Sequence, residues 1–459
     1  MPRIGWASRD ITPQRPAVIP GQMYVRIGRE AADPLTLTAL ALDGGTPNGR
    51  AVFVSCDLTN FTEELQNDVS AEVWKRVPEL SGCPVVLNAT HTHDGFMTIP
   101  GKYAHPGGDV MTAKEGHDWL VANAATAAVD AWGQRRSRHI GRAFAHAVVG
   151  HNRRAVYANG LARMYGKTDD PAFRHIEGFA DHSLDMIFIW EDDGSISGVV
   201  IDIPCPSQVE EHLETFSADF WHDIRLELRK RLGQHLVVLP LCGAAGDQSP
   251  HPLLYGRQEA EMRARSGLSE RQEIAQRVAD AVTRALACTK PMTGAVPVAC
   301  TTIRPVLPGR RVTRSERDWA AVKRAEFLVQ RSDPDQWWPQ RLQEVVDAYD
   351  RDQPMPQAQP TLHIVRLGDA VIATNPFELY IDYAMQIKAR SPTGQTLLVQ
   401  LAGGSAGYLA CARSMQTGDY GSHPASSPIG SEGGQVLVEA TLAAIAGLFP
   451  NQQQAAQSA

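Results

Sequence analysis

Short apolar runs alternate with helical patterns from residue 50 onward, and this rhythm restricts the fold more than any other feature of the chain. Residues 51–55 and 85–87 have the pattern of buried strands, whereas residues 63–77 and 117–132 have the pattern of amphipathic or alanine-rich helices. Such alternation predicts α/β layering. Residues 100–115 are rich in Gly, His and Pro, which predicts a long loop over the mouth of the sheet.

The same pattern continues toward the C-terminus. Residues 187–190 and 199–203 flank the turn Asp192-Asp193-Gly194, which predicts a β-hairpin. Ser269-Glu270-Arg271-Gln272 is a capping box that opens a helix ending near Cys288. Further strands are expected at 236–239, 371–373 and 397–399, and a closing helix at 435–449.

One stretch departs from this rhythm. Residues 308–357 are charged and helical in pattern, and they include Trp337-Trp338, a pair expected to serve packing rather than ligand contact. We interpret the stretch as a helical insertion within one large domain, residues 1–450, followed by a disordered tail at 451–459. No internal repeat is visible in the sequence.

The composition excludes several classes of protein. A hydrophobic content of 43% and a charged content of 21% are ordinary for a soluble globular chain of 459 residues. A net charge of −7 without a basic block makes nucleic acid an unsuitable partner, and no apolar run reaches the ~20 residues that span a bilayer. The seven cysteines are scattered without a C-x-x-C pair, which favours reduced thiols in a cytoplasmic protein. The oligomeric state is open, with a homo-oligomer as one alternative.

The first sign of chemistry is the segment Asn88-Ala89-Thr90-His91-Thr92-His93-Asp94, which follows the strand at 85–87. Residues two apart in an extended segment point to the same side, so His91 and His93 are placed to face one cavity. Imidazole binds transition metals and also titrates near neutral pH. One histidine of the pair is therefore suited to hold a metal while the other moves protons, whereas the alternative is a pair of inert loop histidines.

Other polar residues also follow buried strands. Asp247 and Ser249 come after the strand at 236–239, Glu378 after 371–373, and Tyr408 after 397–399. Ligands of open α/β sheets bind at such strand ends.

Together these motifs resemble those of the neutral/alkaline ceramidase family, in the same order along the chain. The resemblance covers residues 4 to about 445, which correspond to the family's catalytic domain. The motifs are Ile4-Gly5-Trp6-Ala7-Ser8-Arg9-Asp10-Ile11-Thr12-Pro13, Asn88-Ala89-Thr90-His91-Thr92-His93, Asn152-Arg153, Gly246-Asp247-Gln248-Ser249-Pro250, Pro376-Phe377-Glu378, and Tyr408 with Tyr420.

The resemblance implies a layered mixed-sheet catalytic domain and a zinc site. His91, Glu378 and Tyr408 match zinc ligands of the family, and His93 matches the histidine beside the scissile amide. Arg153 and Tyr420 match groups that steady the tetrahedral intermediate, and Ser249 matches a serine proposed as nucleophile. Because the sequence supplies Ser249 with no dedicated base, zinc-activated water is favoured as the attacking group.

Cys205 departs from the family pattern, because it stands where the family has its second histidine ligand. We predict that Cys205 ligates zinc directly, since thiolates bind this metal well. Two alternatives are that Asp219 or His222 takes its place, or that the site is metal-poor and Cys205 is merely buried.

The family's secreted members carry a leader and a C-terminal β-sandwich, and we expect this chain to lack both. Asp94 stands where the family usually has serine, which adds a carboxylate near the pocket. The prediction is therefore a zinc-dependent hydrolase that cleaves a linear amide of a small, polar, soluble substrate, without insertion into a membrane. Alternatives are a metal-dependent lyase or isomerase, an ester or sugar hydrolase, and a non-catalytic metal- or ligand-binding protein.

Overall fold

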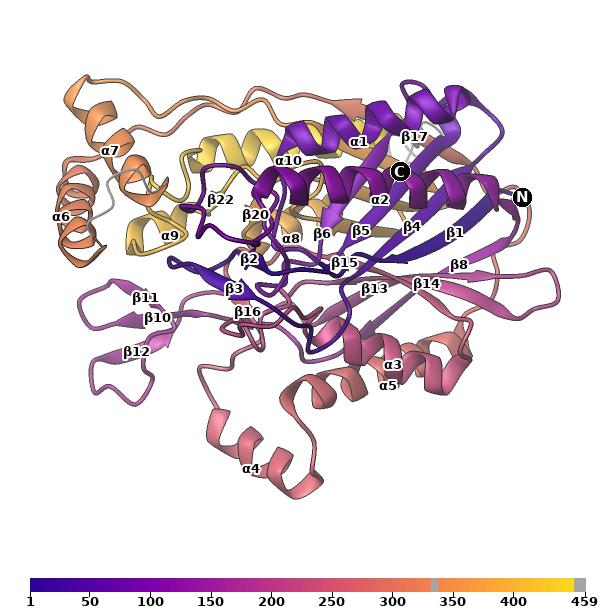
Figure 1. Ribbon diagram of the computed structural model, residues 1–459, viewed down its shortest axis with the longest axis horizontal. Coiled ribbons are helices and arrows are strands. Elements are labelled where there is room, and N and C mark those ends of the chain that lie inside the picture. The colour runs from indigo at the N-terminus through magenta and orange to yellow at the C-terminus, as the bar shows by residue number, and fades with distance from the viewer. Residues whose placement is uncertain (332–336, 450–459) are drawn as a thin grey trace, which may run out of the picture.

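Three four-strand ladders form the body of the protein in the computed structural model, which describes residues 1–331 and 337–449 (Figure 1). Within each ladder, three strands pair antiparallel and a fourth joins the third in parallel. A helix connects the third strand to the fourth, as a parallel connection requires, and a second helix follows the fourth strand. The chain therefore repeats one order of elements three times, which the sequence did not reveal.

Each unit consists of four strands and two helices. The first contains β1 (Arg3–Asp10), β4 (Thr36–Asp43), β5 (Arg50–Cys56), α1 (Glu63–Arg76), β6 (Val85–Ala89) and α2 (Ala113–Gly133). The second contains β8 (His139–His146), β13 (Ser183–Trp190), β14 (Ile196–Ile203), α3 (Phe220–Leu232), β15 (Val237–Cys242) and α5 (Glu270–Cys288). The third contains β17 (Val298–Ile303), β18 (Leu362–Leu367), β19 (Ala370–Thr374), α8 (Ile381–Arg390), β21 (Gln395–Val399) and α10 (Ser431–Gly447).

The three sheets share one apolar centre. Phe53 of the first sheet, Ile189 of the second and Ile372 of the third are buried in the same cluster. The opposite face of each sheet packs against its own helix pair, α1 with α2, α3 with α5, and α8 with α10. Figure 1 shows α1 and α2 on one side of the sheets and α3 and α5 on the other. Burial on both faces explains why the strands appear as continuous apolar runs.

An excursion separates the first and second strands of every unit. In the first unit it is a hairpin, in the second a small sheet, and in the third a helix pair that corresponds to the expected insertion. Figure 1 shows all three excursions beyond the same end of the sheets. Their elements are β2 (Ala17–Ile19) and β3 (Arg26–Gly28), then β9 (His151–Asn152), β10 (Arg154–Tyr157), β11 (Ala162–Met164) and β12 (Phe173–Ile176), then α6 (Arg314–Arg331) and α7 (Trp337–Asp350).

Short elements complete the fold. β16 pairs with β9, β20 pairs in parallel with β22, and β7 extends the first sheet. Short helices connect some of the larger elements. The short strands and helices together are η1 (Pro47–Gly49), η2 (Pro78–Leu80), β7 (Arg136–Ser137), β16 (Gln248–Ser249), α4 (Gly256–Ser266), β20 (Glu378–Leu379), β22 (Tyr408–Leu409) and α9 (Ala412–Thr417).

The predicted α/β layering is confirmed. β13 and β14 form the expected antiparallel hairpin, and the capping box at Ser269 opens α5 as predicted. The helix expected at 117–132 begins earlier, at Ala113, because Thr112 and Glu115 form a second capping box. Helices α3 and α8 were missed; they are 13 and 10 residues long, so each offers a short periodic signal. The tail expected at 451–459 lies outside the described residues.

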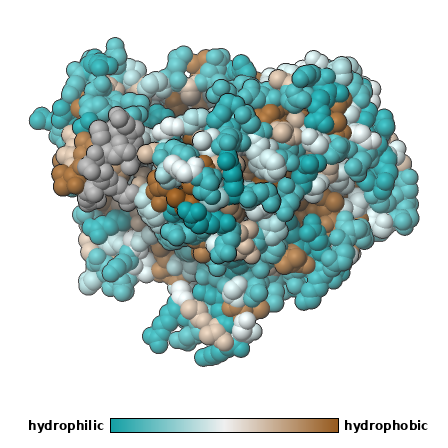
Figure 2. Space-filling view, in the orientation of Figure 1, coloured by the Kyte–Doolittle hydropathy of each residue, from teal (hydrophilic) through white to brown (hydrophobic). Residues whose placement is uncertain are grey.

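The surface agrees with the composition. The face shown in Figure 2 is largely hydrophilic, with hydrophobic residues in scattered patches. No helix among the described residues is long and apolar enough to cross a membrane.

Candidate functional site

His91 lies just beyond the end of β6 in a left-handed conformation, with φ of 64°. Its Nδ1 lies 2.6 Å from the carbonyl oxygen of Thr59. A carbonyl only accepts hydrogen bonds, so Nδ1 carries a proton and donates it. The other ring nitrogen, Nε2, faces Oε2 of Glu378 at 3.3 Å. This geometry resembles that of metal-binding histidines, whose second nitrogen is commonly oriented by a backbone carbonyl.

Glu378 and Tyr408 are direct neighbours in the β20–β22 ladder. Burial alone raises the pKa of Glu378, but His91, a hydrogen bond from Tyr408 and the charge of Arg153 lower it to about 2. The carboxyl is therefore ionised across the physiological range. Burial, Glu378 and Tyr420 raise the pKa of Tyr408 well above its ordinary value, so its phenol keeps its proton in the absence of a metal.

His93 lies beside His91, with the two rings edge to face and their centroids 5.1 Å apart. Its Nδ1 is 3.2 Å from Oε2 of Glu211, although the angle is not that of a good hydrogen bond, and its Nε2 is 2.7 Å from Nε2 of Gln208. Burial lowers the pKa of His93 to about 4, against the opposing charge of Glu211. The backbone of Gly21 passes so close that a methyl group there would lie 2.5 Å from Cγ of His93.

Arg153 reaches the same centre from the second excursion. Its Nη2 donates to the carbonyl oxygen of Gly246 at 2.8 Å and to the Tyr408 hydroxyl at 3.1 Å. Tyr420 packs edge to face against Tyr408, with centroids 5.5 Å apart, and Trp338 of α7 packs on Tyr420 at 5.7 Å. The tryptophan thus supports the site by packing, as expected from the sequence.

Ser249 is fully buried in β16, which pairs with β9 and lies next to Arg153. Its Oγ accepts hydrogen bonds from the Tyr165 hydroxyl and the His251 backbone N–H, both at 3.1 Å. Neither partner is a general base. The geometry agrees with the expectation that Ser249 lacks a dedicated base.

Cys205 follows β14 and is buried, with its Sγ 3.5 Å from the carbonyl oxygen of Pro206. Burial raises the pKa of its thiol well above the ordinary value, and the neighbouring Cys242 and Asp219 add to the effect. Among the described residues, no three His, Cys, Asp or Glu side chains form a group that could hold a metal. Cys205 is therefore not gathered with His91 and Glu378 in such a group, which favours the alternative in which its thiol is merely buried; the predicted ligation of zinc by Cys205 is untested.

Asp219 and His222, the two residues considered as substitutes for Cys205, both lie at the start of α3. Asp219 is the N-cap of α3, and its carboxylate accepts from the backbone N–H groups of Phe220 and Glu210 at 2.7 and 2.9 Å. His222 lies in the first turn of α3 and is half-buried. Asp94 was expected to add charge to the pocket, but its carboxylate is 1% exposed and is held by Arg26 at 2.8 Å.

The donors that do converge fit a metal ion when the phenol is included. The 3.3 Å between His91 Nε2 and Glu378 Oε2 is the separation of a pair that shares a proton, and when the imidazole is neutral both atoms have lone pairs free for a metal ion. Tyr408 adds a third ligand atom, its phenol oxygen. Nitrogen and oxygen donors in this combination suit zinc.

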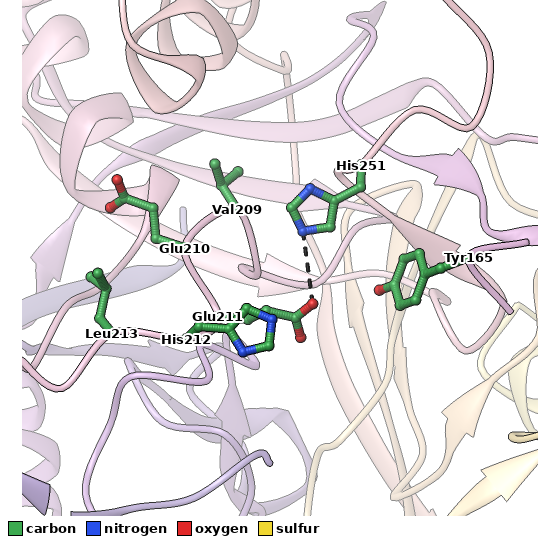
Figure 3. Close-up of a pocket in the computed structure, with 7 residues that line it drawn as sticks. All are labelled: Tyr165, Val209, Glu210, Glu211, His212, Leu213 and His251. Atoms are coloured by element: carbon green, nitrogen blue, oxygen red, sulfur yellow. Dashed lines mark ion pairs between the residues drawn. The ribbon is translucent and has the colours of Figure 1, made fainter. Parts of the chain in front are cut away.

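A cavity of about 500 Å³ adjoins these residues (Figure 3). Glu211 and His251 approach each other across it, with Oε1 and Nε2 3.8 Å apart, and the Tyr165 ring stands at its side. The lining consists of Tyr165, Val209, Glu210, Glu211, His212, Leu213 and His251. The sequence analysis missed this group, and the acidic run Glu210-Glu211 after the strand at 199–203 was the only signal that pointed to it.

The chain is similar in structure to solved ceramidases. It matches the crystal structure of neutral ceramidase from Pseudomonas aeruginosa with a TM-score of 0.70 and 13% identity, over 99% of this chain and 75% of that chain. A ceramidase complexed with C2 matches with a TM-score of 0.69 and 12% identity, over 98% and 75%. No family model matches the sequence, and no curated protein matches it. The chain therefore has the fold of neutral ceramidase, which confirms the predicted fold class.

Proposed function

We propose that this protein is a zinc-dependent hydrolase that cleaves the amide bond of a small, polar substrate. The supporting observation is the opposition of His91 Nε2 and Glu378 Oε2 at 3.3 Å, beside the Tyr408 hydroxyl and the Arg153 guanidinium. The ceramidase fold adds support, since both matched structures are of ceramidases, which are amide hydrolases. His91, Glu378 and Tyr408 would hold the metal.

Zinc in such a site supplies a Lewis acid and activates water near neutral pH. The chain's own residues supply the rest of the reaction. Water adds to the amide carbon, the bond from carbon to nitrogen breaks, and the proton that water loses passes through His93 to the departing nitrogen. Because its pKa is about 4, His93 is neutral at pH 7 and able to accept that proton first.

Arg153 and Tyr420 stabilise the charge that develops on the carbonyl oxygen. Preorganised donors of this kind contribute roughly 3–4 kcal/mol each to lowering the barrier. Arg153 is fixed by its bonds to Gly246 and Tyr408, and Tyr420 is fixed between Tyr408 and Trp338, so neither has to reorganise during the reaction. Ser249, held by Tyr165, is placed to orient water or substrate rather than to attack.

The test is a substrate panel with metal analysis. Purified protein is stripped with a chelator, and hydrolysis of short N-acetyl amides is followed as acetate release before and after ZnCl₂ is added. Activity that disappears on chelation and returns with zinc supports the proposal, whereas turnover that is indifferent to both steps contradicts it. A preference for a long-chain ceramide over the short amides would contradict the proposed substrate class.

A further inference from the structure

The cavity in Figure 3 adjoins the proposed reaction centre, because three of its lining residues contact Ser249 or His93. Tyr165 donates a hydrogen bond to Ser249 Oγ, and the His251 backbone binds the same oxygen. Glu211 lies against His93, the proposed proton carrier. A group bound in this cavity therefore lies beside Glu211, on the His93 side of the proposed reaction centre.

That side holds the departing amine, because His93 protonates nitrogen. The volume of about 500 Å³ is in the range of small-molecule sites, which is roughly 300–1,000 Å³. Val209 and Leu213 offer apolar contact for a short chain of methylene groups, while Tyr165 offers an aromatic face.

Glu211 gives this cavity its charge. Each of its carboxylate oxygens faces one imidazole, Oε2 toward His93 at 3.2 Å and Oε1 toward His251 at 3.8 Å. Gln22 also lies within 3.4 Å of Oε2. Among the described residues, no Lys or Arg pairs with Glu211. Contacts with His93, together with His251 and His212, outweigh burial and lower the pKa of Glu211 to about 2, so the carboxylate is ionised.

The cations nearby are committed to other carboxylates. Arg271 binds Glu210 at 2.8 Å, and it also binds Asp33 and Asp223 at 2.8 and 2.7 Å. Arg26 is fully buried and pairs with Asp94. Glu211 is therefore a partly buried negative charge at a cavity wall that faces imidazoles but no Lys or Arg of the described chain, which favours a positively charged ligand.

We propose that this cavity holds the amine half of the substrate and that Glu211 selects an amine with a second, positively charged group, as in monoacylated diamines. The inference rests on the proposed amide hydrolysis, since it assigns one half of the same substrate. Glu211 is here a specificity residue that also positions His93.

The experiment compares N-acetylputrescine with N-pentylacetamide, a neutral analogue of the same length. Acetate release gives kcat/KM for both amides with wild-type protein, Glu211→Gln, Glu211→Asp and the control Glu214→Gln, an exposed carboxylate that does not line the cavity. We expect wild type and Glu214→Gln to prefer the cationic amide by about tenfold or more, as charge-assisted hydrogen bonds allow. Glu211→Gln should reduce the ratio to near one, and Glu211→Asp should restore part of it.

The ratio separates recognition from positioning. A disturbed His93 slows both amides equally, so a fall in both rates at an unchanged ratio overturns the selection of charge. A wild-type protein that hydrolyses both amides equally well also overturns it, whether or not the variants fold.

A binding measurement distinguishes an error in this cavity assignment from an error in the proposed amide hydrolysis. If wild type turns over neither amide, calorimetry with the same two compounds decides. Tighter binding of N-acetylputrescine that is lost in Glu211→Gln supports the cavity although the proposed reaction fails. Equal binding of the two amides overturns the cavity assignment.

Discussion

Glu378 and Cys205 occupy the same place in the repeated order of elements, yet their surroundings differ. Each follows the third strand of its unit and precedes that unit's first helix. Glu378 faces His91 Nε2 at 3.3 Å, whereas the Cys205 thiol lies against the Pro206 carbonyl at 3.5 Å and near Cys242. The comparison teaches that topology brings a residue to the strand ends, while the polar atoms that face it decide whether it is suited to chemistry.

The largest effect that tests this difference between Glu378 and Cys205 is expected when the charge of Glu378 is removed. In Glu378→Gln we expect zinc content to fall to background and amide hydrolysis to fall by more than about 10³-fold, because one ligand and the charge opposite His91 are lost. Metal analysis by plasma mass spectrometry and acetate release measure the two effects. Glu439→Gln, on the surface in an ion pair with Arg390, is the control. Full zinc occupancy in Glu378→Gln would show that the metal binds elsewhere.

At the centre that contains Glu378, the variant His93→Ala separates the binding of the metal from the transfer of the proton. Loss of a general acid–base should lower kcat by about 10²–10⁴-fold while zinc content stays at the wild-type level. Kinetics with metal analysis on one preparation checks both parts. Loss of zinc in this variant would mean that His93 is a ligand, and an unchanged kcat would exclude it from proton transfer.

Alkylation sharpens the description of Cys205. A raised pKa keeps a thiol protonated as pH rises, so the reactive thiolate of Cys205 should remain scarce at pH 8.5, whereas the exposed Cys288 is accessible. We expect iodoacetamide to modify Cys288 at least about tenfold faster in native protein, measured by peptide mass spectrometry. In denatured protein the two rates should converge. Rapid modification of native Cys205 would contradict its burial as a thiol.

The smallest effect is expected from Cys205→Ala. Removal of a thiol packed between Cys242 and Pro206 should destabilise the fold by about 1 kcal/mol and leave zinc content and kcat within about twofold of wild type. Denaturant unfolding and metal analysis test this. Loss of zinc in Cys205→Ala would support the prediction from the sequence that Cys205 is a zinc ligand. The Cys205 and Glu378 positions would then have the same role.

Much of the architecture was accessible from local pattern. β5, β6, β13 and β14 appeared as apolar runs because both of their faces are buried, and Ser269 marked the start of α5 through its capping box. The threefold repetition was not accessible, since an order of strands and helices recurs without similarity in sequence. The excursions differ most between units, and they supply the walls of the site through Gly21, Arg153 and Trp338.

The sequence by itself determined the types of the main elements and the presence of His91, His93, Glu378 and Tyr408 at strand ends, because periodicity and side-chain chemistry are local properties. Only the tertiary structure decided which of them meet. His91 and Glu378 are 287 residues apart in the chain, and they face each other because two different sheets share one core. The same packing turned Cys205 inward, committed Asp94 to Arg26 and placed Glu211 beside His93. Those outcomes depend on long-range contacts that no local pattern encodes.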